Sequence, residues 1–113
     1  MQTQIQSKGF ELHDAQKYLI NKSTSNVERY LNQLSYTQPN INVVASCHRS
    51  PRPIFTVHVY LELSSDKISA IATSRRFAQA LNESMDHLKR QIRKRKTDLL
   101  KQRESDKIIT STA

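Results

Sequence analysis

Residues 55–63 have the sequence FTVHVYLEL, in which apolar and polar side chains alternate. Alternation with a period of two is typical of a β-strand that buries one face and leaves the other face in water. The apolar side chains that would form the buried face are Phe55, Val57, Val59, Leu61 and Leu63. This segment therefore predicts a strand in a sheet that is covered on one side.

The neighbouring segments extend this sheet in both directions. After a turn at 64–67, apolar residues recur at every second position of 68–72 and predict a fourth strand. Before a turn at 49–53 that contains two prolines, the β-branched run 41–50 predicts a second strand. Because short turns join these three strands, we expect them to pair antiparallel.

A first strand and two helices complete the predicted domain. Residues 3–10 alternate weakly and predict a short strand closed by Gly9. Helical spacing predicts a helix over 14–34, with His13 or Asp14 as its N-cap and an apolar stripe of Leu12, Ala15, Leu19, Val27, Leu31 and Leu34. A second stripe predicts a helix within 74–103, through Phe77, Leu81, Met85, Leu88 and Ile92.

The resulting order β-α-β-β-β-α predicts an α+β fold with a four-stranded, mainly antiparallel sheet and two helices on one face. With 113 residues and 36% hydrophobic residues, the chain fits one domain, which we place at 1–103. The segment 104–113 ends in small polar residues, and we expect it to be a disordered tail.

Composition excludes several classes of protein. The single cysteine, Cys47, cannot form an intramolecular disulfide and fits a reducing compartment. No apolar run is long enough for a membrane span, and the polar residues after Met1 do not resemble a leader, so we expect a cytoplasmic protein. One glycine in the whole chain is too few for a glycine-rich phosphate loop.

Positive charge is concentrated in one element. Residues 74–103 contain ten lysines and arginines against three acidic residues, so they carry +7 of the net charge of +8. A pI near 9.9 with its excess on one helix is typical of a protein that binds nucleic acid. The alternative is a solvated helix that is basic without binding nucleic acid. The single sign of the charges argues against this alternative.

The order of elements and the last helix together resemble the ribosome hibernation promoting factors, the family that includes ribosome-associated inhibitor A, in their short form. The family's signature in that helix, Leu-x-Arg-Gln-Leu-x-Lys-x-Lys, is matched by Leu88, Arg90, Gln91, Ile92, Lys94 and Lys96. Near the N-terminus, Glu11-Leu12, Ala15, Val27-Glu28, Tyr30 and Leu34 fit the family's first strand and helix without a gap. The resemblance covers residues 1–103.

The resemblance implies a fold similar to the double-stranded RNA-binding domain and a function that is not enzymatic. Members occupy the messenger and transfer RNA channel of the small ribosomal subunit and so inhibit translation in stationary phase or under stress. We accordingly expect a cytoplasmic, ribosome-associated protein that is monomeric away from the ribosome. It would need no cofactor, metal, membrane or small-molecule substrate. Whether ribosomes are only blocked or are also paired into dimers stays open.

Ten cations are the candidate contacts to ribosomal RNA. The resemblance carries over Arg90, Lys94 and Lys96 on the last helix and Lys17 on the first. Local charge and helical direction add Arg75, Arg76, Lys89, Arg93, Arg95 and Lys101. The chain departs from the family where Arg75 and Arg76 replace an acidic start of the last helix, and where His87 replaces a lysine.

Two other classes of function remain as alternatives. An enzyme would need a constellation built from His13, His48, His58, His87 and Cys47, but Cys47 and His48 are adjacent and would leave a strand on opposite faces. For His58 a structural hydrogen bond is the favoured role. A protein-interaction module would dock the basic helix on an acidic partner and use Tyr60 on the wet sheet face. Reading of RNA by that face is not favoured, because Tyr60 is the only aromatic residue that the pattern places suitably there, and Phe10 is expected in the core.

Overall fold

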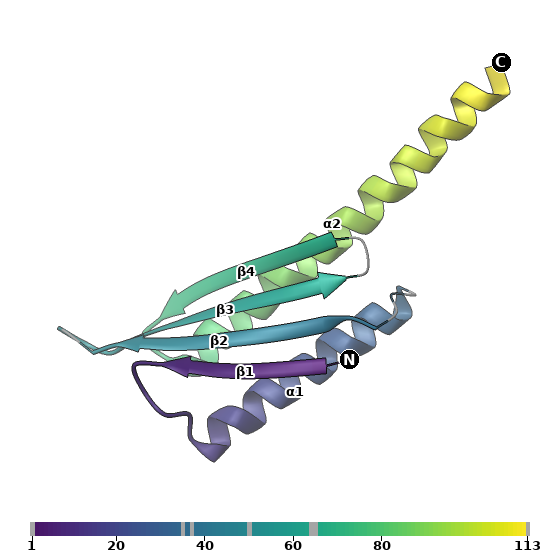
Figure 1. The fold of residues 1–113 in the computed structure, drawn as a ribbon. Coiled ribbons are helices and arrows are strands. Elements are labelled where there is room, and N and C mark those ends of the chain that lie inside the picture. The colour runs from purple at the N-terminus through teal and green to yellow at the C-terminus, as the bar shows by residue number, and fades with distance from the viewer. Residues whose placement is uncertain (1, 35, 37, 50, 64–65, 113) are drawn as a thin grey trace.

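The computed structural model describes all residues except 1, 35, 37, 50, 64–65 and 113. For residues 98–112 it describes the helical backbone and not the side chains. Its elements are β1 (Gln2–Lys8), α1 (Asp14–Gln33), β2 (Asn40–His48), β3 (Ile54–Leu63), β4 (Asp66–Ser74) and α2 (Phe77–Thr112). The predicted order of strands and helices is confirmed. Figure 1 shows the two helices on the same face of the sheet, with α2 continuing well beyond its edge.

The sheet has the strand order β1-β2-β3-β4. β2, β3 and β4 pair antiparallel, in a register that places Val43 opposite Val59 and Val59 opposite Ala70. β1 pairs parallel to β2, so the chain must cross over between them, and α1 is that crossover. The sheet is therefore mixed and mainly antiparallel, as predicted.

One hydrophobic core lies between the sheet and the helices. The alternate residues of β2 to β4 that the sequence predicted to be apolar point into it, among them Val43, Val57, Val59 and Leu61, none of them more than 1% exposed. α2 contributes the whole predicted stripe, together with Ala80 and Ser84. At one end, the ring of Phe55 lies edge-on to those of Phe10 and Phe77, with centroids 5.6 and 5.9 Å apart. Phe10 packs against the core, as expected.

The stripe predicted for α1 was wrong at Ala15, which is exposed, while its other members pack in or against the core. The fully buried positions of the helix are Ile20, Thr24, Val27 and Leu31. The spacing of these four, at intervals of four, three and four residues, is itself helical. Thr24 can be buried because its hydroxyl donates to the carbonyl of Asn21 at 3.0 Å. His13 is the N-cap, and its backbone N–H donates to Oε1 of Gln16 at 2.8 Å.

Some element boundaries differ from the prediction. β1 ends at Lys8, because Gly9 has a φ of +79° and turns the chain toward α1. α2 begins at Phe77, since Ser74 still belongs to β4 and its Oγ accepts a hydrogen bond from the backbone N–H of Arg76 at 3.2 Å. The backbone of α2 remains helical to Thr112, beyond residue 103, where the sequence predicted its end. Because the side chains of that segment lie outside the described part, the disordered tail at 104–113 stays a prediction.

Candidate nucleic-acid interface

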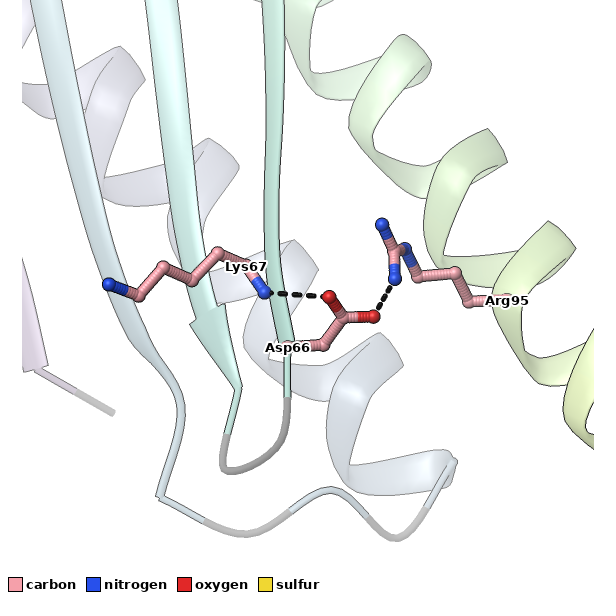
Figure 2. A network of polar contacts seen from close by, with 3 residues as sticks. All are labelled: Asp66, Lys67 and Arg95. Carbon is pink, nitrogen blue, oxygen red and sulfur yellow. Dashed lines mark hydrogen bonds and ion pairs between the residues drawn. The ribbon is translucent and has the colours of Figure 1, made fainter.

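Two contacts hold α2 to the edge strand β4. The Nε2 of Gln91 donates to the backbone carbonyl of Ser69 at 2.8 Å. One turn further along, the guanidinium of Arg95 forms an ion pair with the carboxylate of Asp66, and this carboxylate also accepts the backbone N–H of Lys67 at 2.9 Å (Figure 2). Gln91 and Arg95 are four residues apart, so they lie on the same side of the helix.

Two further contacts hold α2 to α1 on its other side. The Nε of Arg93 donates to the hydroxyl of Tyr30 at 3.4 Å. The Nζ of Lys96 donates to the backbone carbonyl of Leu34, the C-cap of α1, at 3.5 Å. Carbonyls at a helix C-terminus lack partners within their own helix, so a lysine here stabilises the end of α1.

The inward side of this part of α2 is closed by Leu88 and Ile92, both 0% exposed. With three sides occupied, the remaining side faces away from the sheet and carries Arg90 and Lys94. Both are exposed, and neither side chain has a hydrogen-bond or ion-pair partner among the described residues. The fold therefore presents two adjacent free cations on the outer face of a helix that is anchored on its other sides.

A second pair of cations lies at the start of the same helix. Arg75 and Arg76 are exposed, between the end of β4 and the first turn of α2. Glu83 and Asp86 lie between the two pairs in the sequence, and Glu83 accepts a hydrogen bond from Gln79 at 3.1 Å. This arrangement agrees with two zones of positive charge along α2.

Of the other predicted contacts, Lys17 lies apart from these cations. Lys17 is exposed near the N-terminal end of α1, beside a hollow lined by Ile5, Ser7, Glu11 and Leu12, at the β1 edge of the domain. It lies thirteen residues before Tyr30, which is about 20 Å along the helix axis from the level of Arg93. Lys89 is half-buried, and the side chain of Lys101 lies outside the described residues.

Two of the candidate catalytic residues, His13 and Cys47, line the same hollow, but no hydrogen bond joins their side chains in the described part of the chain. Cys47 is half-buried against Phe10 and Phe55 at the end of the sheet, and the neighbouring His48 is exposed. His58 has the structural hydrogen bond that was favoured for it, because its Nδ1 and the hydroxyl of Tyr60 are 2.9 Å apart. Within the described part of the chain, no three His, Cys, Asp or Glu side chains are grouped so that they could hold a metal ion.

Comparison with known families gives one match over most of the chain. The family described as sigma 54 modulation protein / S30EA ribosomal protein matches residues 3–100. The chain belongs to this family. The predicted kinship with the hibernation promoting factors is thereby confirmed, and the S30EA family is one of ribosome-associated factors and not of enzymes.

Solved structures show the same fold. The N-terminal domain of Thermus thermophilus Protein Y has a TM-score of 0.70 and 16% sequence identity, over 83% of this chain and 98% of that domain. A ribosomal subunit interface protein from Coxiella burnetii has a TM-score of 0.66 and 21% identity, over 86% of this chain and 99% of that one. No curated protein sequence matches this chain significantly.

The structure shows that the residues of the S30EA signature in α2 have different roles. Leu88 and Ile92 fill the core, while Gln91 and Lys96 bond to backbone carbonyls of β4 and α1. This leaves Arg90 and Lys94 as the positions that face outward. Sequence reasoning missed the anchoring partners Tyr30 and Asp66, because nothing in their local pattern indicates which distant helix position they contact.

No helix in the described part of this S30EA protein is both long and apolar enough to cross a membrane.

Proposed function

We propose that this protein binds the small ribosomal subunit through its ribosomal RNA, in the channel used by messenger and transfer RNA, and inhibits translation in stationary phase or under stress. Membership of the S30EA family supports a role on the ribosome. The similar structure from Coxiella burnetii is that of a ribosomal subunit interface protein, which supports the same location. The protein acts by occupying the site, as a monomer without a cofactor, and not by catalysis.

The observation that carries the proposal is the free outer face of α2. Arg90 and Lys94 are exposed and unpaired among the described side chains, and the exposed Arg75 and Arg76 form a second zone at the start of the same helix. Each phosphate that such a cation neutralises releases condensed counterions, which favours binding to RNA without any reading of base sequence. Arginine can also bind one phosphate through two parallel hydrogen bonds.

Anchoring of α2 supports a rigid interface. Gln91 and Arg95 fix the helix to β4, and Arg93 and Lys96 fix it to α1. Because the helix is already ordered, little backbone entropy is lost when Arg90 and Lys94 meet their phosphates. A rigid basic surface suits folded RNA, since an RNA helix hides its major groove and is recognised through its shape and backbone.

Charge reversal on this outer face tests the proposal. We expect the double variant Arg90→Glu/Lys94→Glu to lose co-sedimentation with small ribosomal subunits at physiological salt, with an unchanged circular dichroism spectrum. The matched control is Arg49→Glu/Arg52→Glu, which changes the net charge equally at exposed positions in the turn between β2 and β3. This control is expected to sediment with the subunits as the parent protein does.

Two outcomes would contradict the proposal. One is co-sedimentation of Arg90→Glu/Lys94→Glu at the parent level, and the other is translation that proceeds undisturbed in an extract with the protein in molar excess over ribosomes. RNase treatment distinguishes RNA binding from the remaining alternative, in which the protein is a protein-interaction module. If α2 docks on an acidic protein, the high-mass complex survives digestion of the RNA, whereas an RNA-anchored protein is released.

A further inference from the structure

The sheet face opposite the helices has no cover in the described structure. Its residues are the outward positions of the four strands, and they include two of the most exposed large apolar side chains, Tyr60 at 44% and Ile71 at 55%. In Figure 1 this is the face turned to the viewer, while both helices lie behind it. It is therefore separated from the outer face of α2 by the thickness of the domain.

A stacked pair of aromatic side chains stands on this open face. The rings of His58 and Tyr60 lie 4.0 Å apart between centroids, with an angle of 23° between their planes. The hydrogen bond between Nδ1 of His58 and the hydroxyl of Tyr60 joins the same two side chains. His58 thus orients the ring of Tyr60 and covers one of its two faces.

The other face of the Tyr60 ring borders a hollow. Tyr60 and Glu62 line this hollow and His58 does not, and the three follow one another along the same side of β3. Tyr60 therefore stands between His58 and the hollow. A flat ring placed in the hollow could continue the stack as its third member.

The rest of the lining is rich in hydrogen-bonding groups. The hollow has a volume of about 410 Å³, within the range of small-ligand sites, and its floor carries the side-chain amides of Gln2, Gln4, Asn40 and Asn42. The Oδ1 atom of Asn42 is buried and has no hydrogen-bond partner in the described structure. A buried acceptor without a partner is unfavourable, and rotation of this amide toward a ligand would satisfy it.

A cationic side chain lies at the rim. Lys67 also lines the hollow, and Figure 2 shows its side chain pointing away from Asp66 and Arg95, across β3 toward β2. The site thus offers an aromatic face, several amides that can both donate and accept, one ammonium group, and the carboxylate of Glu62 opposite Lys67. A nucleotide has the complementary groups, namely a flat base with donors and acceptors on its edge and a phosphate.

We propose that the open sheet face binds an unpaired nucleotide of single-stranded RNA, with its base stacked on Tyr60, its edge bonded to the amides of β1 and β2, and its phosphate near Lys67. The sequence pattern disfavoured reading of RNA by this face, because Tyr60 was the only aromatic residue that it placed suitably. The structure adds His58, which makes Tyr60 one layer of a stack. This site is distinct from the α2 face, so it does not depend on how α2 binds the ribosome.

Titration of the isolated protein with short RNA tests the site. The protein should carry Arg90→Glu/Lys94→Glu, so that binding of phosphates by α2 does not mask the second site. We expect adenosine 5′-monophosphate to shift the side-chain amide NMR signals of Gln4 and Asn42, and hexa-adenylate to bind at least about tenfold more tightly, because it adds phosphates near Lys67. Ribose 5-phosphate, which lacks the base, should shift neither amide.

Variants of Tyr60 give the sharper comparison. Tyr60→Leu removes the aromatic face and should weaken binding of hexa-adenylate by about tenfold or more. Tyr60→Phe keeps the ring and loses the hydroxyl that bonds to His58, so we expect its affinity to stay within about threefold of the parent protein. Both substitutions lie at an exposed position, so neither should unfold the domain.

Several results would overturn the proposal. These are equal affinity of Tyr60→Leu and the parent for hexa-adenylate, equal binding of adenosine 5′-monophosphate and ribose 5-phosphate, and a hexanucleotide that binds no better than the mononucleotide. Sedimentation equilibrium that shows a dimer broken by Tyr60→Leu would assign the face to a second copy of the chain instead. None of these results bears on the ribosome test, which changes residues of α2 alone.

Discussion

Arg95 of α2 is ion-paired with Asp66, the first residue of β4 (Figure 2). The side chains are 43% and 36% exposed, so solvent screens the pair, and its contribution to folding is at most about 1 kcal/mol. The ion pair matters more for the charge of α2 than for the stability of the fold. The carboxylate of Asp66 neutralises one cation of α2, on the side of the helix that faces β4.

Replacing Asp66 should therefore strengthen binding to RNA. We expect Asp66→Asn to raise the affinity for small ribosomal subunits about two- to fivefold at low salt, because a repulsion between a carboxylate and phosphate of up to about 1 kcal/mol is removed and Arg95 is released. The free energy of unfolding should fall by less than about 1 kcal/mol. A filter-binding titration and a urea melt measure the two effects.

Asp14→Asn is the matched control for this variant. It also removes one negative charge from an exposed position, but in the first turn of α1, outside the outer face of α2 and the open face of the sheet. Its affinity should stay close to that of the parent protein. If both variants bind more tightly by the same factor, overall net charge and not the local pair controls the affinity.

Ile92 should be indispensable for stability although it lies within the basic segment. It is 0% exposed, and Ile92→Ala would leave a cavity between α2 and the sheet that costs about 2–5 kcal/mol in the free energy of unfolding. The neighbouring Arg90→Ala removes an exposed side chain and should cost less than about 0.5 kcal/mol. Urea denaturation of both variants checks this, and equal losses would show that the assigned inward direction of Ile92 is incorrect.

Most of the fold could be predicted because periodicity is a local signal. Alternation in β3 and the stripe of α2 each specify a buried face, and both stripes are buried in the structure. The start of α1 could not be predicted in the same way. Ala15 fits an apolar stripe by spacing, yet it is exposed, whereas Thr24 enters the core because a bond to the backbone satisfies its hydroxyl.

The candidate interface could be predicted less completely than the fold. Four of the ten candidate cations came from the family resemblance and six from local charge and helical direction. Three of those on α2 nevertheless donate to partners within the fold, namely Arg93, Arg95 and Lys96. Tyr30 and Leu34 are some sixty residues away from the cations that they bind. Contacts between distant segments do not produce a periodic pattern in a single sequence. The structure was therefore needed to tell which cations anchor α2 and which face outward.

Gly9 should resist replacement. Its φ of +79° is costly for any other residue, and a Cβ atom at this position would lie 2.8 Å from the backbone carbonyl oxygen of Cys47. We expect Gly9→Ala to destabilise the fold by more than about 1 kcal/mol, since the clash is with backbone that cannot rotate away. Ser7→Ala, at an exposed position of the preceding strand β1, should be nearly neutral, and a thermal melt compares the two.

The salt dependence of ribosome binding should distinguish outward cations from anchored ones. If Arg90 and Lys94 each neutralise a phosphate, then Arg90→Gln or Lys94→Gln should reduce the slope of log affinity against log salt concentration by about 0.7–0.9. Arg95→Gln removes the same charge from the same helix, but that charge is already paired with Asp66, so its slope should change by less than half as much. Equal changes in all three variants would mean that RNA displaces Asp66 from Arg95 on binding, and that the ion pair of the free protein does not persist in the complex.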